Sequence, residues 1–253
     1  SQVGDQRHVK LLRHNIRMAE HAGSLVDALD DEEAAKKIVR WIHHNYDNPE
    51  TNRDYRVALK QFGRRATDAN GDDPPESMEW IPSSTPSTYD PAPQPGDMLT
   101  WEDDGLPMID ATRNYRDAAL IAVAWDAGPR SGELRSLTLG DITDYTHGYQ
   151  ITVQGKTGQR TIGLVPSVPF LQRWLNDHPG NNGDDPLWSK LSEAVEPTYQ
   201  TLLAAVKDAA QRAGVDKPVT FTNFRKSSAS YLASEGMNQA HLLKEVFHIE
   251  EGM

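Results

Sequence analysis

NYRDAALIAVAWDAGPRSGELRSLTLGDI (residues 114–142) decides the fold of the second half of the chain. Its long apolar run, residues 118–124, predicts a helix. Gly128 and Pro129 end that helix, and Ser131 is a plausible N-cap for a second helix. Two helices therefore meet at a tight glycine-proline turn.

Arg130 lies in this turn, at the start of the second helix. Backbone N–H groups and the helix dipole at such a start favour an anion, and a guanidinium adds a bidentate grip on phosphate oxygens. Glu133, one turn later, either orients the arginine or complements the dipole. The pattern predicts a phosphate site.

The stretch YQITVQGKTGQRTIGL (149–164) contains two short alternating runs around GKTG, and predicts a β-hairpin with Lys156 at the turn. It is not a phosphate-binding P-loop, because the upstream glycine and the strand-to-helix context are missing. Two interpretations stay open for Lys156: a solvated turn lysine, or a cation that reaches into a groove and delivers a proton.

FTNFRKSSASYLASEG (221–236) predicts a helix that Thr220 or Thr222 caps and Gly236 ends, with Arg225 in its first turn. A last helix follows, and His248 stands near its end. By itself a histidine there is usually an ordinary surface or core residue.

Three helical segments, 8–29, 30–46 and 48–66, make up the first part of the chain. In the third, apolar residues gather on one side and cations on the other. The cations either form a solvated face or contact a phosphate backbone. They are Arg53, Arg56, Lys60 and Arg64.

The net charge of −11 is concentrated in one segment, because residues 67–110 carry eleven acidic residues and no Lys or Arg. Its Pro- and Ser-rich part predicts an extended interdomain linker over 67–97. Asp exceeds Glu by 23 to 14 and Arg exceeds Lys by 16 to 10, as in proteins from salt-loving organisms.

Cysteine is absent, which excludes disulfides, thiolate zinc sites and cysteine nucleophiles. No apolar run is long enough to span a membrane, and the start does not read as a signal peptide. We therefore expect a cytoplasmic protein.

Taken together, the order of these motifs resembles that of the tyrosine recombinase, or phage integrase, family. AGPRSGEL (127–134) is similar to the first arginine motif of the family and places Arg130 and Glu133 on its positions. Lys156 falls on the position of the hairpin lysine.

TNFRKS (222–227) resembles the second motif, usually histidine-x-x-arginine, and places Arg225 on the second arginine. His248 falls on a position that histidine or tryptophan occupies. TNRDYRVALKQFGR (51–64) is similar to the end of the core-binding domain of the family.

The resemblance implies a mainly α-helical fold with a small antiparallel sheet, at 141–164. It also implies two domains: a helical core-binding domain over 1–66 and, after the linker, a catalytic domain over 98–253. The expected partner is double-stranded DNA, with self-association on it from dimer to tetramer. Expected DNA contacts are Arg53, Arg56, Lys60, Arg64 and Lys226.

The implied activity is site-specific cleavage and rejoining of DNA strands through a 3′-phosphotyrosine, without a metal or other cofactor. Arg130 and Arg225 would neutralise phosphate oxygens, and Lys156 would protonate the leaving 5′-oxygen. His248, with Thr222, would hydrogen-bond the phosphate.

Two departures from the family pattern limit this reading. Thr222 replaces the usual histidine, and the tyrosine nucleophile, expected about nine residues after His248, would fall near position 257. Truncation, natural loss and supply by a partner in trans all stay open. The alternative functions are a catalytically inactive, integrase-derived DNA-binding protein and an acidic helical interaction protein.

Overall fold

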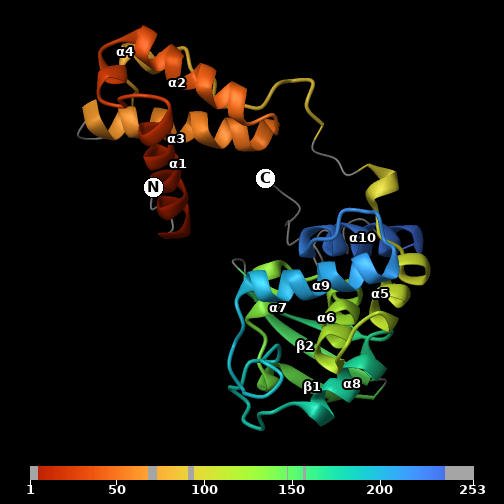
Figure 1. Ribbon diagram of the computed structural model, residues 1–253. Coiled ribbons are helices and arrows are strands. Elements are labelled where there is room, and N and C mark those ends of the chain that lie inside the picture. Colours follow the sequence, from red (N-terminus) through yellow and green to blue (C-terminus); the bar gives the residue numbers. More distant parts are fainter. Residues whose placement is uncertain (1–4, 68–72, 91–93, 147, 156–157, 237–253) are drawn as a thin grey trace. The chain divides into compact units, whose positions relative to one another are not determined.

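The computed structural model describes residues 5–67, 73–90, 94–146, 148–155 and 158–236. The chain divides into two compact units, Ser1–Ala92 and Pro93–Met253 (Figure 1). Within the described ranges, no helix is both long and apolar enough to cross a membrane.

The first unit is helical. Its long helices correspond to the three predicted segments, although the first ends at His21, shortly before Gly23, whose φ of +143° does not continue a right-handed helix. Its elements are α1 (Asp5–His21), the 3₁₀ helix η1 (Asp27–Leu29), α2 (Glu32–Asn45), α3 (Pro49–Thr67) and α4 (Glu76–Glu79).

Part of the acidic segment belongs to this unit, which corrects the expectation of an extended linker over 67–97. Met78 and Ile81 are fully buried in the core of the first unit. Ser77 Oγ lies 2.8 and 2.7 Å from two carbonyl oxygens of η1. A Cβ on Gly63 would stand 2.7 Å from Met78 Sδ, so this glycine admits the segment. The overall composition of the acidic segment did not indicate that Met78 and Ile81 would be buried.

The second unit is mainly helical with a small antiparallel sheet, as predicted. Its helices are η2 (Pro95–Asp97), the π-helix η3 (Trp101–Gly105), α5 (Leu106–Asp110), α6 (Tyr115–Asp126), α7 (Ser131–Arg135), η4 (Leu139–Asp141), α8 (Val168–Asp177), α9 (Tyr199–Ala213) and α10 (Phe221–Ser234). Its strands are β1 (Ile142–Tyr145), β2 (Gly148–Gly155) and β3 (Gly158–Leu164).

Helix α6 forms the centre of this unit. Every residue from Arg116 to Trp125 is buried, and α5, α8, α9 and α10 all pack against the helix (Figure 1). The apolar run 118–124 therefore faces protein on all sides.

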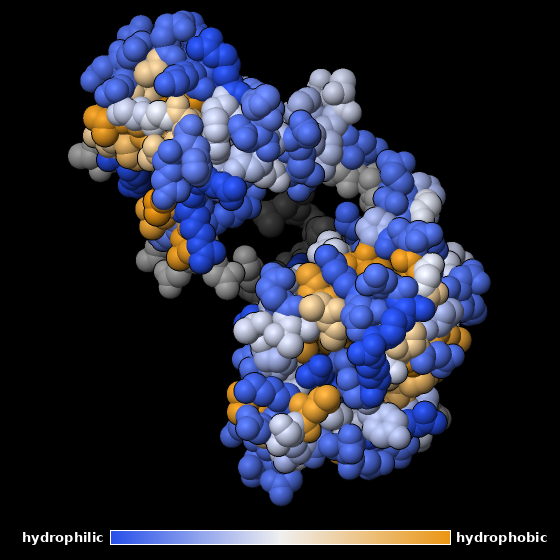
Figure 2. Space-filling view, in the orientation of Figure 1, coloured by the Kyte–Doolittle hydropathy of each residue, from blue (hydrophilic) through white to orange (hydrophobic). Residues whose placement is uncertain are grey.

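On the surface that Figure 2 shows, the exposed side chains are mostly hydrophilic, with scattered apolar residues.

The strands pair in the order β1-β2-β3, all antiparallel, which confirms the predicted hairpin. In its register Val153 faces Arg160, and Gly155 faces Gly158. Asp126, at the end of α6, holds the chain that leaves β3, because its carboxylate accepts hydrogen bonds from Val165 N–H and from the backbone and hydroxyl of Ser167. The sheet is thus fixed to the central helix.

Candidate anion-binding site

Arg130 is the N-cap of α7, with extended backbone angles of φ −64° and ψ 150°. Its backbone N–H donates to Glu133 Oε2 at 2.9 Å, and its Nη1 donates to Glu133 Oε1 at 3.0 Å. Glu133 thus contacts both the backbone and the side chain of the arginine. Ser131, the expected N-cap, is the first helical residue instead.

A third residue, Arg160 on β3, joins this pair. Its Nη2 lies 2.9 Å from Glu133 Oε2, and both side chains are buried, at 7% and 5% exposure. Sequence reasoning missed Arg160. A signal was present, because Arg160, Ile162 and Leu164 alternate along one strand, and a cation among such inward positions indicates a buried ion pair.

The carboxyl of Glu133 is held ionised by its neighbours. Burial raises its pKa, but hydrogen bonds from Arg160 and from the backbone and side chain of Arg130 outweigh burial and lower the pKa to about 2. Gly155 at the end of β2 lies against this carboxyl, since a Cβ there would stand 2.9 Å from Oε1. The end of β2 therefore approaches the first turn of α7.

Arg225 reaches the same place from α10. Thr220 caps this helix by accepting the Asn223 N–H at 3.0 Å. Arg225 is 8% exposed, and its Nη1 donates to Gly128 O at 2.7 Å. Gly128 has φ of +51°, and a Cβ there would stand 3.1 Å from Ser228 Oγ, so glycine is strongly favoured where the two helices meet.

The three arginines and Glu133 form one electrostatic cluster with a summed charge of +2. Burial, and then repulsion from Arg130 and Arg160, lower the pKa of Arg225 to about 10, while Glu133 opposes the shift. Arg225 therefore stays protonated at neutral pH. Arg130 is 46% exposed at its side chain, so an anion can reach the cluster there.

Other predicted site residues are placed less fully. Thr222 is exposed and Lys226 is partly exposed on α10. Lys156 and His248 lie outside the described residues. Among the side chains that the structure describes, no group of three or more His, Asp or Glu could hold a metal ion.

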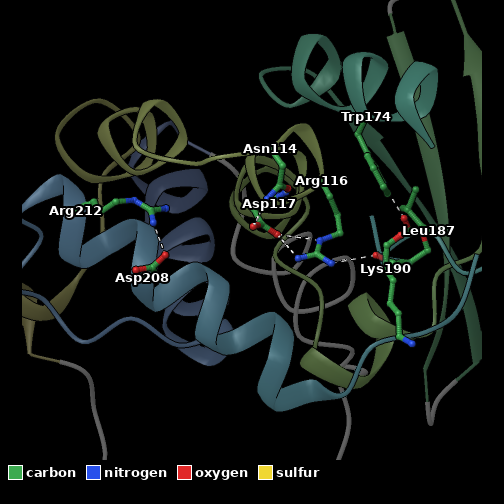
Figure 3. A network of polar contacts seen from close by, with 9 residues as sticks. Asn114, Arg116, Asp117, Trp174, Leu187, Lys190, Asp208 and Arg212 are labelled. Atoms are coloured by element: carbon green, nitrogen blue, oxygen red, sulfur yellow. Dashed lines mark hydrogen bonds and ion pairs between the residues drawn. The ribbon is translucent and has the colours of Figure 1, made fainter. Parts of the chain in front are cut away.

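The segment after α8 holds α7 in position. Trp188 Nε1 donates to Leu134 O, in α7, at 2.8 Å. Trp174 Nε1 donates to Leu187 O at 2.7 Å. Figure 3 shows this contact, and shows Arg116 pointing at Asp117 and at the chain leading to Lys190. Arg116 Nη1 reaches the carbonyl oxygen just before Lys190 at 3.1 Å.

The predicted cationic stripe of α3 is not open to solvent along its whole length. Arg56 is buried, at 3% exposure, and donates to Asn52 and to the backbone carbonyls of Pro82 and Ser84. Its guanidinium holds the segment after α4, so the structure contradicts the expectation that Arg56 contacts DNA.

Two other cations of the stripe, Arg53 and Lys60, also contact backbone carbonyls. Arg53 Nε donates to the carbonyl of Ser83 at 3.0 Å, although the residue is exposed. Lys60 Nζ lies 3.1 and 2.9 Å from the carbonyl oxygens of Glu79 and Ile81. Arg64 is partly exposed.

The fold and this cluster define a mainly helical domain with a candidate anion site that is rich in arginine. Residues 102–249 match the phage integrase family over more than half of the chain, and the chain belongs to that family. No curated protein sequence matches it.

Solved structures show the same fold. A lambda integrase dimer bound to a COC′ core site has a TM-score of 0.75 at 15% identity, covering 100% of this chain and 71% of that chain. The XerH site-specific recombinase bound to difH substrate, in a pre-cleavage complex, has a TM-score of 0.66 at 20% identity, covering 87% and 64%. This chain thus spans less than two thirds of the XerH chain.

Proposed function

We propose that this chain belongs to a site-specific DNA recombinase, catalytic in its full-length form, whose second unit binds the scissile phosphate. The observation that carries the proposal is the convergence of Arg130 and Arg225, from helices far apart in sequence, on a cluster of summed charge +2. Membership of the phage integrase family supports it. The structural neighbours include recombinases bound to DNA as dimers and tetramers.

In this proposal a tyrosinate oxygen attacks phosphorus, a 3′-phosphotyrosine bond forms as the bond from phosphorus to the 5′-oxygen breaks, and the leaving 5′-oxygen takes up a proton. Arg130 and Arg225 neutralise the non-bridging oxygens as negative charge develops on them. Lys156 supplies the proton to the 5′-oxygen, while His248 and Thr222 hydrogen-bond the phosphate. Phosphotyrosine conserves the bond energy, so the reaction needs no cofactor.

The first unit serves, in the proposal, as a helical core-binding domain that contacts the duplex with the second unit. Arg53, Lys60 and Arg64 on α3, and Lys226 on α10, would contribute phosphate contacts. The chain would assemble on DNA as a dimer or tetramer and act in the cytoplasm. We also propose a salt-rich source, from the excess of Asp over Glu.

Duplex binding tests the electrostatic part. Affinity measured by fluorescence anisotropy should fall steeply with salt, and Arg130→Ala should flatten the slope of log K against log[salt] by about one. Arg135→Ala is the matched control, because Arg135 is exposed on the same helix and pairs with Glu196 at 2.8 Å. Binding that does not depend on salt would contradict the proposal.

A second candidate is DNA binding without strand cleavage. It is favoured by Thr222, whose exposed hydroxyl replaces a histidine and is a poorer proton acceptor. Incubation of the 253-residue chain with a nicked duplex, followed by denaturing electrophoresis, tests whether a tyrosine within these residues is the nucleophile. We expect binding without a covalent adduct. An adduct would show that a tyrosine within these residues is the nucleophile.

A further inference from the structure

We infer that Arg160 is a positioning residue of the anion site. Arg160 fixes the carboxylate of Glu133, and Glu133 in turn orients Arg130. The inference rests on the proposed function, because it concerns how the same site is set for a phosphate. It assigns a task to a strand residue that lies outside the two arginine motifs.

The contacts form a chain from the interior to the surface. Glu133 Oε2 accepts both Arg160 Nη2 and the backbone N–H of Arg130, each at 2.9 Å. The other oxygen, Oε1, accepts Arg130 Nη1 at 3.0 Å. A single buried carboxylate is thus fixed on one side by Arg160 and orients Arg130 on the other.

Burial separates the tasks of the two arginines. The Arg160 side chain is 7% exposed, whereas the Arg130 side chain is 46% exposed. The Nε and Nη1 groups of Arg160 are buried and have no acceptor among the described residues. Among the described residues, Glu133 is therefore the anionic partner of Arg160. Arg160 affects an external anion through Glu133 and not by touching it.

The geometry of the backbone supports the same order of action. Arg160 belongs to a strand whose register is fixed by β2, with Val153 opposite it. Arg130 lies instead at the start of a five-residue helix, which has few internal hydrogen bonds of its own. The rigid strand therefore supplies a fixed point, and the carboxylate transmits its position to the short helix.

A charge-conserving double variant tests this inference. Arg160→Gln with Glu133→Gln removes one positive and one negative charge, so the cluster keeps its summed charge of +2 while Arg130 loses its support. Inorganic sulfate is the probe, because its charge is constant above about pH 3 and it is tetrahedral like phosphate. Sulfate affinity is measured by calorimetry, and stability by thermal unfolding, on the full chain.

We expect sulfate binding to weaken at least tenfold in the double variant while its Tm stays within about 5 °C of the parent, since a neutral pair replaces a buried ion pair. The matched control is Arg135→Gln with Glu196→Gln, an exposed ion pair that includes the same helix, and it should keep the parent affinity. A purely structural role would move Tm and leave the affinity of the folded protein unchanged.

A second double variant, Arg160→Met with Glu133→Leu, keeps the same summed charge with apolar packing and decides the matter if the first does not fold. Parent-like sulfate affinity in either folded double variant would overturn the inference. So would a parent chain that does not bind sulfate, or a failure of both variants to fold. Duplex binding by the parent is measured separately. Its loss would contradict the proposed function, whereas sulfate results alone bear on the positioning.

Discussion

Replacing Glu133 by Gln should remove a stabilising contribution whose size depends on pH. The ordinary pKa of a Glu is 4.5. In the folded chain burial raises the pKa of Glu133, but Arg160 and Arg130 outweigh burial and lower the pKa to about 2. A difference of about 2.5 pH units corresponds to about 3 kcal/mol. Because the folded-state pKa is the lower one, this contribution is complete above about pH 5 and disappears as the pH falls towards 2.

Urea unfolding of the parent and of Glu133→Gln at pH 7, 5, 4 and 3 measures this contribution. The difference in free energy of unfolding between them should be constant from pH 7 to 5, and should shrink progressively below pH 4.5, by about 2 kcal/mol at pH 3. Glu196→Gln is the control, since that carboxylate is half exposed and its ion pair contributes little. A difference that stays the same at pH 3 and pH 7 would refute the placement of Glu133 between two arginines.

Three further outcomes are expected. Arg56→Met should destabilise the first unit by about 2–4 kcal/mol in thermal unfolding, because three carbonyl or amide acceptors lose a buried cation. Arg65→Met is the control, because Arg65 is exposed and its replacement should cost less than about 0.5 kcal/mol. Equal effects of the two substitutions would contradict the buried contacts of Arg56. Gly155→Ala should lower the free energy of unfolding in urea by about 1–3 kcal/mol, since its Cβ would lie 2.9 Å from a carboxylate oxygen of Glu133. Gly163→Ala is the control and should cost much less, because there is open space around Gly163. The reverse order would refute the close approach of β2 to α7. Arg64→Ala should flatten the salt dependence of duplex binding by about one unit of slope, and an unchanged slope would leave this residue on a solvated face.

Local rules made part of the site predictable. The spacing of Arg130 and Glu133 places them one helical turn apart, so their contact follows from helix geometry once α7 forms. The alternation and glycines of 149–164 specified the hairpin in the same way. The buried helix α6 followed from its apolar run, because a solvated helix with that composition would be unstable.

Contacts between distant parts of the chain could not be predicted in this way. Arg160 and Glu133 are 27 residues apart, and they meet because the sheet register and the packing of α7 bring them together. Arg225 and Gly128 are 97 residues apart, and nothing in either local sequence identifies the other as its partner.

The first unit shows the same division. The sequence by itself determined that α3 has an apolar side and a cationic side, because a period of 3.6 residues separates them. Only the tertiary structure decided that Arg56 faces backbone carbonyls. Met78 and Ile81 are buried in the core, and their burial brings the carbonyls of Pro82 and Ser84 next to Arg56. The charge of a side chain is fixed by its residue type, but its partner depends on which distant segment packs next to it in the folded core.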